Sequence, residues 1–263
     1  MHILVTGATG GIGRGICEVL AAQNTQNLKL TVCNSKGGDS LNYLQKSLSD
    51  MGVWVRGIWG DVSQVEDAPR WVREAIAEGG DLDALVCVAG ASGPGNLTDL
   101  SVQQWDQTFN LNTRSVFLMA QAAYASLKRT QGSITAIASM SGLHPHPGYG
   151  AYSPAKAALI MLCRQLAQEW GPDGIRTNTV CPGMVRTPLT EAVYRNPDIK
   201  ANREALVPLG RIGRPDDIGQ AVSYLISAGA AYVNGQNLVV DGGVADHMLT
   251  MIPGRPGKPA LKA

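Results

Sequence analysis

A tyrosine and a lysine stand four residues apart in segment 152–156, which reads Tyr-Ser-Pro-Ala-Lys. If this segment opens a helix, Tyr152 and Lys156 share one face, and Pro154 is tolerated because it falls in the first turn. A phenol titrates near roughly pH 10 and a nearby cation favours the phenolate, so we expect Lys156 to lower the pKa of Tyr152. Such a pair can exchange a proton with a substrate oxygen. An ordinary aromatic side chain beside a solvated lysine is the alternative.

A glycine-rich turn stands near the amino terminus, where an apolar run at 3–6 leads into Thr-Gly-Ala-Thr-Gly-Gly-Ile-Gly at 6–13. At the carboxyl end of a parallel strand, such a turn binds dinucleotides. Glycine lets phosphate oxygens approach the backbone, and the dipole of the following helix favours the anion. The spacing G-x-x-x-G-x-G differs from the more familiar G-x-G-x-x-G, so a turn without a ligand is the alternative.

The elements that must position these motifs are visible as short, continuously apolar runs separated by amphipathic stretches. Runs of this kind indicate strands buried on both faces, and their alternation with helices predicts a parallel sheet. Ser101 and Gln104 form a capping-box pattern that predicts a helix from 102 to about 128. The seven expected strands are 3–6, 28–33, 53–58, 84–88, 133–138, 175–180 and 237–240.

No Pro/Ser-rich linker or internal repeat divides the chain. The helical and strand periodicity ends after Gly243, where Pro253, Pro256 and Pro259 interrupt any element. We therefore expect a single dinucleotide-binding and catalytic domain over 1–243 and an irregular tail over 244–263.

The composition excludes several classes of protein. The chain has 22 Lys and Arg against 21 Asp and Glu, with no run of like charge, so we expect no binding to nucleic acid or to an anionic membrane. No apolar run is long enough for a membrane helix and no leader precedes the first strand, which favours a cytoplasmic protein. The five cysteines are widely spaced, which favours neither a disulfide framework nor a metal site.

The two motifs occur together and in order, with further matching residues between and after them. In this combination the sequence resembles the compact single-domain branch of the short-chain dehydrogenase/reductase family, over roughly 3–243. That resemblance implies a Rossmann-like, doubly wound α/β fold of about seven parallel strands with helices on both faces. The matching residues are the turn at 6–13, Asp61-Val62, Ala89-Gly90, Trp105-Asp106, Asn112, Ser139, Tyr152 with Lys156, Pro182-Gly183, Thr187 and Asp241-Gly242-Gly243.

The resemblance implies four catalytic residues. Ser139 would hydrogen-bond the substrate oxygen, and Tyr152 would exchange a proton with it. Lys156 would lower the tyrosine pKa and hold the ribose hydroxyls of the nicotinamide, while Asn112 would anchor a water that links Lys156 to solvent. Ser141 is the competing serine, although the family spacing favours Ser139.

The resemblance also implies the cofactor site and its preference. Where an acidic residue would bind both ribose hydroxyls, the chain reads Cys33-Asn34-Ser35-Lys36, so NADP is favoured and NAD stays possible. Asp61 would meet the adenine edge, and Thr187 would contact the nicotinamide amide. The expected cofactor-binding residues are Gly7, Thr9, Gly11, Ile12, Gly13, Asn34, Ser35, Lys36, Asp61, Val62, Ala89, Gly90, Tyr152, Lys156, Pro182, Gly183, Val185 and Thr187.

A substrate pocket is expected beside the tyrosine. The stretch 184–208 fits the lid that covers substrate in this family. The histidines have no clustered cysteine or carboxylate partner, so we expect no metal site. The expected pocket residues are Ser141, His144, His146, Tyr149 and Met184.

The leading hypothesis is an NAD(P)-dependent oxidoreductase that moves a hydride between nicotinamide and a small secondary alcohol or ketone. Reduction of a 3-oxoacyl thioester on acyl carrier protein is an alternative, with Lys128 and Arg129 as part of a docking patch. A non-catalytic redox sensor has little need to keep Ser139, Tyr152 and Lys156 together. A dehalogenating lyase on this fold would lose the glycine turn and the lysine. Family analogy implies a homotetramer.

Overall fold

The computed structural model describes residues 1–23 and 27–247. The expected tail lies outside this range from residue 248 onward. All seven predicted strands are confirmed and pair in parallel within one sheet. They are β1 (His2–Thr6), β2 (Lys29–Asn34), β3 (Trp54–Trp59), β4 (Ala84–Cys87), β5 (Ser133–Ile137), β6 (Arg176–Pro182) and β7 (Asn237–Val240).

The strand order is β3-β2-β1-β4-β5-β6-β7. The winding reverses between β1 and β4, and ligands of open α/β sheets bind outside the carboxyl ends of strands at that point. One side chain ties the two carboxyl ends together. The Thr6 hydroxyl oxygen accepts hydrogen bonds from the backbone N–H of Val88 at 3.0 Å and of Ala89 at 3.1 Å.

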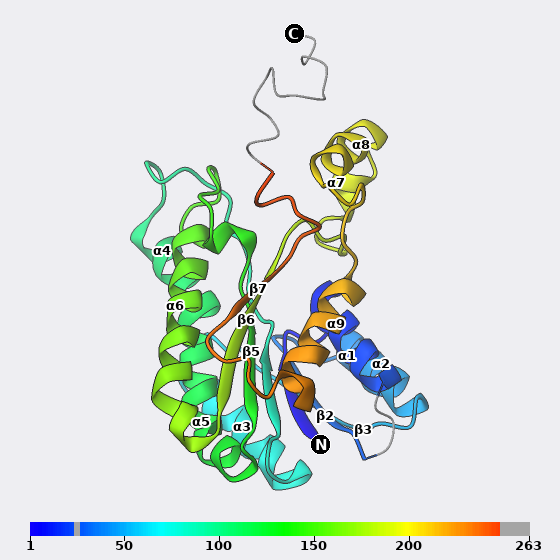
Figure 1. Cartoon of the computed structure of the whole chain (residues 1–263), viewed down its shortest axis with the longest axis vertical. Coiled ribbons are helices and arrows are strands. Elements are labelled where there is room, and N and C mark those ends of the chain that lie inside the picture. The colour runs from blue at the N-terminus through cyan, green and yellow to red at the C-terminus, as the bar shows by residue number, and fades with distance from the viewer. Residues whose placement is uncertain (24–26, 248–263) are drawn as a thin grey trace.

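Helices cover both faces of the sheet, as the resemblance implied (Figure 1). One layer contains α1, α2 and α9, and the other contains α3, α4, α5 and α6. The short helices α7 and α8 project beyond the carboxyl edge of the sheet. The bounds are α1 (Gly11–Gln23), α2 (Asp39–Asp50), α3 (Asp67–Gly79), α4 (Val102–Phe109), α5 (Ser115–Thr130), α6 (Tyr152–Trp170), α7 (Glu191–Tyr194), α8 (Pro197–Leu206) and α9 (Pro215–Ile226).

Each layer has its own apolar core. Leu4, Trp71 and Leu85 belong to the core under α3, α5 and α6, while Ile3 and Val86 belong to the core under α1, α2 and α9. Neighbouring residues of β1 and β4 therefore point to opposite faces, as the pleat of a strand requires. The continuous apolar runs of the sequence are explained by burial on both sides.

The predicted helix at 102–128 is present but interrupted. The Ser101–Gln104 capping box forms, with the Gln104 backbone N–H donating to Ser101 Oγ at 3.2 Å. After α4 comes a π-helical turn, Asn110–Arg114, and only then α5. Single π turns inside helices often occur at functional sites, and this one contains Asn112.

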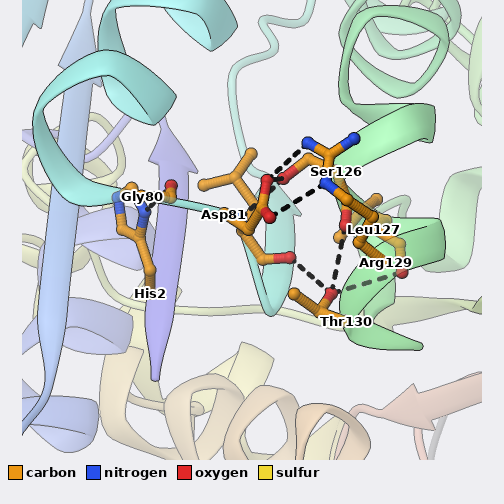
Figure 2. A network of polar contacts seen from close by, with 8 residues as sticks. His2, Gly80, Asp81, Ser126, Leu127, Arg129 and Thr130 are labelled. Carbon is orange, nitrogen blue, oxygen red and sulfur yellow. Dashed lines mark hydrogen bonds and ion pairs between the residues drawn. The ribbon is translucent and has the colours of Figure 1, made fainter.

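A polar network anchors the far end of α5 to the amino-terminal edge of the sheet (Figure 2). The Asp81 carboxylate accepts hydrogen bonds from Ser126 Oγ and from the Arg129 guanidinium. These contacts lower the pKa of Asp81 to about 2. On the same edge, Thr130 Oγ1 donates to the Leu82 carbonyl at 2.7 Å. The network fixes one end of α5, and the turn with Asn112 stands at its other end.

Residues 1–23 and 27–247 were searched for membrane-spanning helices and for groups of metal-binding side chains. Within them, no helix has the length and hydropathy needed to cross a bilayer. The same residues contain no group of three or more His, Cys, Asp or Glu side chains able to hold a metal ion. The five cysteines are all buried as free thiols.

Candidate active site

The glycine turn leaves no room for side chains at three positions. Gly7 has a φ of 61°, and a Cβ there would lie 2.9 Å from the Ala89 backbone, just after β4. A Cβ at Gly13 would collide with the Gly7 carbonyl oxygen and lie 2.9 Å from Ala8 Cα. A Cβ at Gly11 would lie 2.6 Å from Thr187 Cβ. The turn is a bare backbone cradle at the start of α1, which suits a pyrophosphate.

The collision at Gly13 leads to the first prediction. We expect Gly13→Ala to weaken dinucleotide binding by at least about tenfold and to lower the free energy of unfolding by about 1–3 kcal/mol, because the added methyl group meets backbone. Thermal melting with and without NADP measures both effects. Gly10→Ala is the control, since its Cβ would lie 3.3 Å from the Gly7 carbonyl oxygen. Unchanged NADP binding by Gly13→Ala would contradict the placement of the cradle.

Ser139, Tyr152 and Lys156 come from two neighbouring segments. Ser139 follows β5 after one intervening residue. Helix α6 begins at Tyr152, so the predicted helix start is confirmed and Pro154 falls in the first turn. The helix places Lys156 one turn below Tyr152, with Lys156 Nζ 5.7 Å from the centre of the phenol ring. Ser139 lies near enough to Tyr152 to lower the pKa of its phenol. The sheet and α6 thus bring the three groups together.

The electrostatics of Tyr152 differ from the expectation. Burial raises the pKa of the phenol, Ser139 lowers it less, and Tyr149 raises it further. The prediction that Lys156 lowers the pKa of Tyr152 is therefore wrong for the polypeptide by itself. The physical reason is that the apolar surroundings penalise the phenolate, while the ammonium lies against the ring. A neutral phenol is the form that can donate a proton.

Lys156 is itself an unusual residue, because its side chain is only 2% exposed. Its Nζ donates a hydrogen bond to the Ile137 carbonyl at 2.8 Å. Burial lowers the pKa of Lys156 to about 8. A lysine with this pKa can take up and release a proton near physiological pH, which a solvated lysine cannot do.

Asn112 completes the group. Its Nδ2 donates to the carbonyls of Ala91 at 2.9 Å and Thr108 at 3.0 Å, which fixes the amide. Its Oδ1 is buried without a hydrogen-bond partner among the described residues. A Cβ at Gly90 would lie 2.7 Å from this Oδ1 and 3.2 Å from Lys156 Nζ, so both atoms face the backbone of Gly90. The unsatisfied Oδ1 fits the expected water-anchoring role.

The expected adenosine side of the site lies at the ends of β2 and β3. Asn34 Nδ2 donates to the Lys36 carbonyl at 3.1 Å, while the Ser35 and Lys36 side chains are exposed. The Asp61 carboxylate accepts hydrogen bonds from Ser63 N–H and Oγ, so it caps its own turn. Val62 is buried, so its side chain faces the core.

The expected nicotinamide side lies at the end of β6. Gly183 N–H donates to the Val240 carbonyl at 3.1 Å, and Val185 forms an isolated parallel bridge with Gly213. Thr187 lies against Gly11, so the start of the 184–208 stretch reaches the glycine turn. The other expected cofactor residues lie in the cradle itself, at Ile12 and Thr9.

The expected substrate-pocket residues are only partly brought together. Ser141, His144 and His146 line a cavity of about 610 Å³ beside the start of α6. Tyr149 stacks on His146 with ring centres 3.8 Å apart. Met184 does not line this cavity, and its carbonyl instead accepts from Gly213 N–H at 2.9 Å.

Sequence reasoning missed a second cavity of about 320 Å³ next to the glycine turn. It lies between the starts of α1 and α2 and is lined by Thr9, Arg14, Asp39 and Tyr43, among others. The pair Gly37-Gly38, directly before a polar helix start, was the available signal. Arg14 Nε lies 2.7 Å from Glu18 Oε1, so the positive charge of Arg14 is already in an ion pair.

Residues 7–245 match the family model described as Enoyl-(Acyl carrier protein) reductase. The acetoacetyl-CoA reductase of an Acinetobacter strain is 34% identical over 93% of this chain and 97% of its own length. The 2-(S)-hydroxypropyl-CoM dehydrogenase 3 of Xanthobacter autotrophicus is 33% identical over 92% of this chain and 95% of its own. This chain belongs to the short-chain dehydrogenase/reductase family.

A solved short-chain dehydrogenase/reductase from Mycobacterium marinum has the same fold, with a TM-score of 0.84 and 31% identity, over 92% of this chain and 94% of that one. As a short-chain dehydrogenase/reductase, the chain is an oxidoreductase that transfers a hydride between a nicotinamide cofactor and an alcohol or carbonyl group.

Proposed function

We propose that this short-chain dehydrogenase/reductase interconverts a small secondary alcohol and its ketone, with NADP as the preferred cofactor. One observation carries the proposal: Ser139, Tyr152 and Lys156 lie together beside the glycine cradle. The unpartnered Oδ1 of Asn112 lies next to them. The cradle suits the pyrophosphate. The Lys156 ammonium and the unpartnered Asn112 Oδ1 are polar groups for ribose hydroxyls and a water. When bound, the nicotinamide supplies or accepts the hydride.

The residues of the chain have separate tasks in this reaction. Tyr152 donates a proton to the carbonyl oxygen during reduction and takes it back during oxidation, as a general acid and base. Ser139 hydrogen-bonds the same oxygen and stabilises the charge that develops on it. Lys156, with its pKa of about 8, returns the proton to Tyr152.

The test follows the absorbance of reduced nicotinamide with purified protein and a panel of ketones, sugars, steroids and acyl thioesters. We expect turnover of at least one ketone with NADPH, and of the matching alcohol with NADP. A protein that binds NADP tightly but turns over no member of the panel would overturn the proposal and favour the redox sensor.

Reduction of a 3-oxoacyl thioester is the second candidate, because the Acinetobacter relative carries the name acetoacetyl-CoA reductase. The docking patch expected for an acyl carrier does not gain support from the structure. Lys128 pairs with Asp173 at 2.7 Å, and Arg129 pairs with Asp81 at 2.6 Å. Comparing acetoacetyl-CoA with a simple 2-ketone in the same assay separates the two candidates.

The cofactor preference rests on Lys36, whose ammonium forms no ion pair with any residue that the structure describes. We expect Lys36→Ala to lower kcat/KM for NADP by about tenfold to a hundredfold, because a charge-assisted contact with the 2′-phosphate is lost. For NAD, kcat/KM should stay within about twofold. Lys46→Ala on α2 is the matched control, since Lys46 is exposed and pairs with Asp50. Equal losses with both cofactors would contradict the assignment.

The remaining proposals concern organisation. We propose that 1–243 forms one catalytic domain, because a single sheet takes strands from residue 2 to residue 240.

We also propose that the protein forms a homotetramer and that it is located in the cytoplasm. Exposed apolar side chains on α5 and α6, Phe117 and Met161, support an assembly, and the free thiols support a reducing compartment. Light scattering of the purified protein measures the assembly.

A further inference from the structure

The cavity of about 610 Å³ lies between segment 95–97, segment 141–148 and the first turn of α6. Its volume is within the range of sites for small organic molecules. None of the residues that line it is Asp, Glu, Lys or Arg, and most are Gly, Pro, Leu or Ala. The chemistry of the lining therefore suits an uncharged, largely apolar group.

Two backbone hydrogen bonds hold the wall of this cavity in place. Gly95 N–H donates to the Gly148 carbonyl at 2.9 Å, and Gly150 N–H donates to the Gly95 carbonyl at 2.9 Å. The loop after β4 and the loop before α6 are thereby joined, with Gly95 and Tyr149 forming an isolated bridge. The cavity is formed before any ligand enters, which reduces the ordering cost of binding.

Five of the lining residues are polar, and two of them, Ser141 and His146, form a pair; the others are Asn96, His144 and Ser153. Ser141 Oγ and His146 Nδ1 are 2.8 Å apart, and His146 N–H donates to Ser153 Oγ at 3.2 Å. Burial lowers the pKa of His146, and the positive charge of Arg203 on α8 lowers it further, so the imidazole is neutral at pH 7. A neutral imidazole and a hydroxyl carry two polar hydrogens between them, and their mutual bond uses one. Whichever tautomer is present, one donor remains for a ligand.

The same pair adjoins the catalytic residues. Ser141 N–H donates to Ser139 Oγ at 3.1 Å. His146 stacks on Tyr149, whose ring centre is 6.5 Å from that of Tyr152. Ser141 and His146 therefore connect the cavity to Ser139 and Tyr152, which do not themselves line it.

We infer that this cavity holds the larger substituent of the alcohol or ketone, an uncharged apolar group with one hydrogen-bond acceptor that meets the Ser141–His146 pair. The inference rests on the proposed function and names its substrate class: medium-chain or aryl ketones and their secondary alcohols, not oxo acids.

The first test is a series of 2-alkanones from butanone to decanone with NADPH. We expect kcat/KM to rise by about threefold to fourfold for each added methylene until the cavity is full. An oxo acid of the same length should react more slowly than the neutral ketone. Equal rates along the series, or a preference for the oxo acid, would overturn the inference.

Ala157→Leu tests the location, because Ala157 lines the cavity from α6 and its added side chain would occupy the space. We expect kcat/KM for 2-octanone to fall at least about tenfold while that for butanone stays within about twofold. Ala125→Leu on α5 is the matched control, since Ala125 is exposed and does not line the cavity. If the two variants behave alike, the substituent lies elsewhere.

His146→Phe tests the hydrogen bond while keeping an aromatic ring against Tyr149. The ratio of kcat/KM for 6-methoxy-2-hexanone to that for the similarly sized 2-octanone should fall by about twofold to tenfold. An unchanged ratio would remove His146 from substrate recognition. If butanone itself shows no turnover that depends on Tyr152, the proposed function fails. If butanone reacts but chain length has no effect, only the cavity assignment fails.

Discussion

Replacing Tyr152 by phenylalanine is expected to lower kcat by about 10²–10⁴-fold, the range that a general acid contributes. The phenol is the only group of α6 placed both next to Ser139 and over Lys156. The ring itself is retained in the variant, so the fold and the stacking beside Tyr149 should persist. Steady-state rates with NADPH and the best ketone measure the loss.

The control for this variant is cofactor binding. The affinity of Tyr152→Phe for NADPH, followed by nicotinamide fluorescence, should stay within about threefold of the parent, because the pyrophosphate is held by the glycine cradle. Activity that survives in Tyr152→Phe would show that another group moves the proton.

Lys156→Met is expected to lower kcat by about 10²–10³-fold and yet to raise the melting temperature. The loss arises because methionine has no proton to return to Tyr152 and no donor for the ribose hydroxyls. The gain arises because a buried ammonium with one carbonyl partner is replaced by an apolar chain of similar length. Rates and thermal melting of the same samples measure both effects.

The pH dependence of stability provides the control for Lys156. Its pKa is about 8 in the folded chain and about 10.4 in an unfolded one. Between these values the unfolded state binds more protons, so stability rises with pH. The cost of the buried ammonium is complete below about pH 8 and is relieved as the pH approaches 10.4. The melting advantage of Lys156→Met should therefore shrink between pH 7 and pH 10, and a constant advantage would contradict the buried charge.

The fold was largely predictable because its signals are local. Each strand is a short run of apolar residues, and burial on both faces makes such runs continuous, as in β1 and β4. The glycine turn and the start of α6 were predictable for the same reason. The π turn at Asn112 was not, because it depends on contacts with Ala91 that no local pattern encodes.

The pKa shifts of the site residues also could not be predicted from the sequence. The spacing of Tyr152 and Lys156 correctly predicts a shared helix face, but the depth of burial decides the direction of both pKa shifts. Burial depends on how α4, the π turn at 110–114 and the loop at 139–151 cover the helix. The pairing of Ser141 with His146 likewise arises from the fold of a loop, and proline-rich sequence alone does not specify it.

Deuterium transfer tests the central claim most directly. Protein, the best ketone and NADPH that carries deuterium at the reactive carbon of the nicotinamide are mixed, and the alcohol is analysed by mass spectrometry. We predict one deuterium on the carbinol carbon, a hydroxyl proton from solvent, and loss of both product and label in Tyr152→Phe. Alcohol formed without the label would contradict the account, as would labelled alcohol formed equally fast without the phenol.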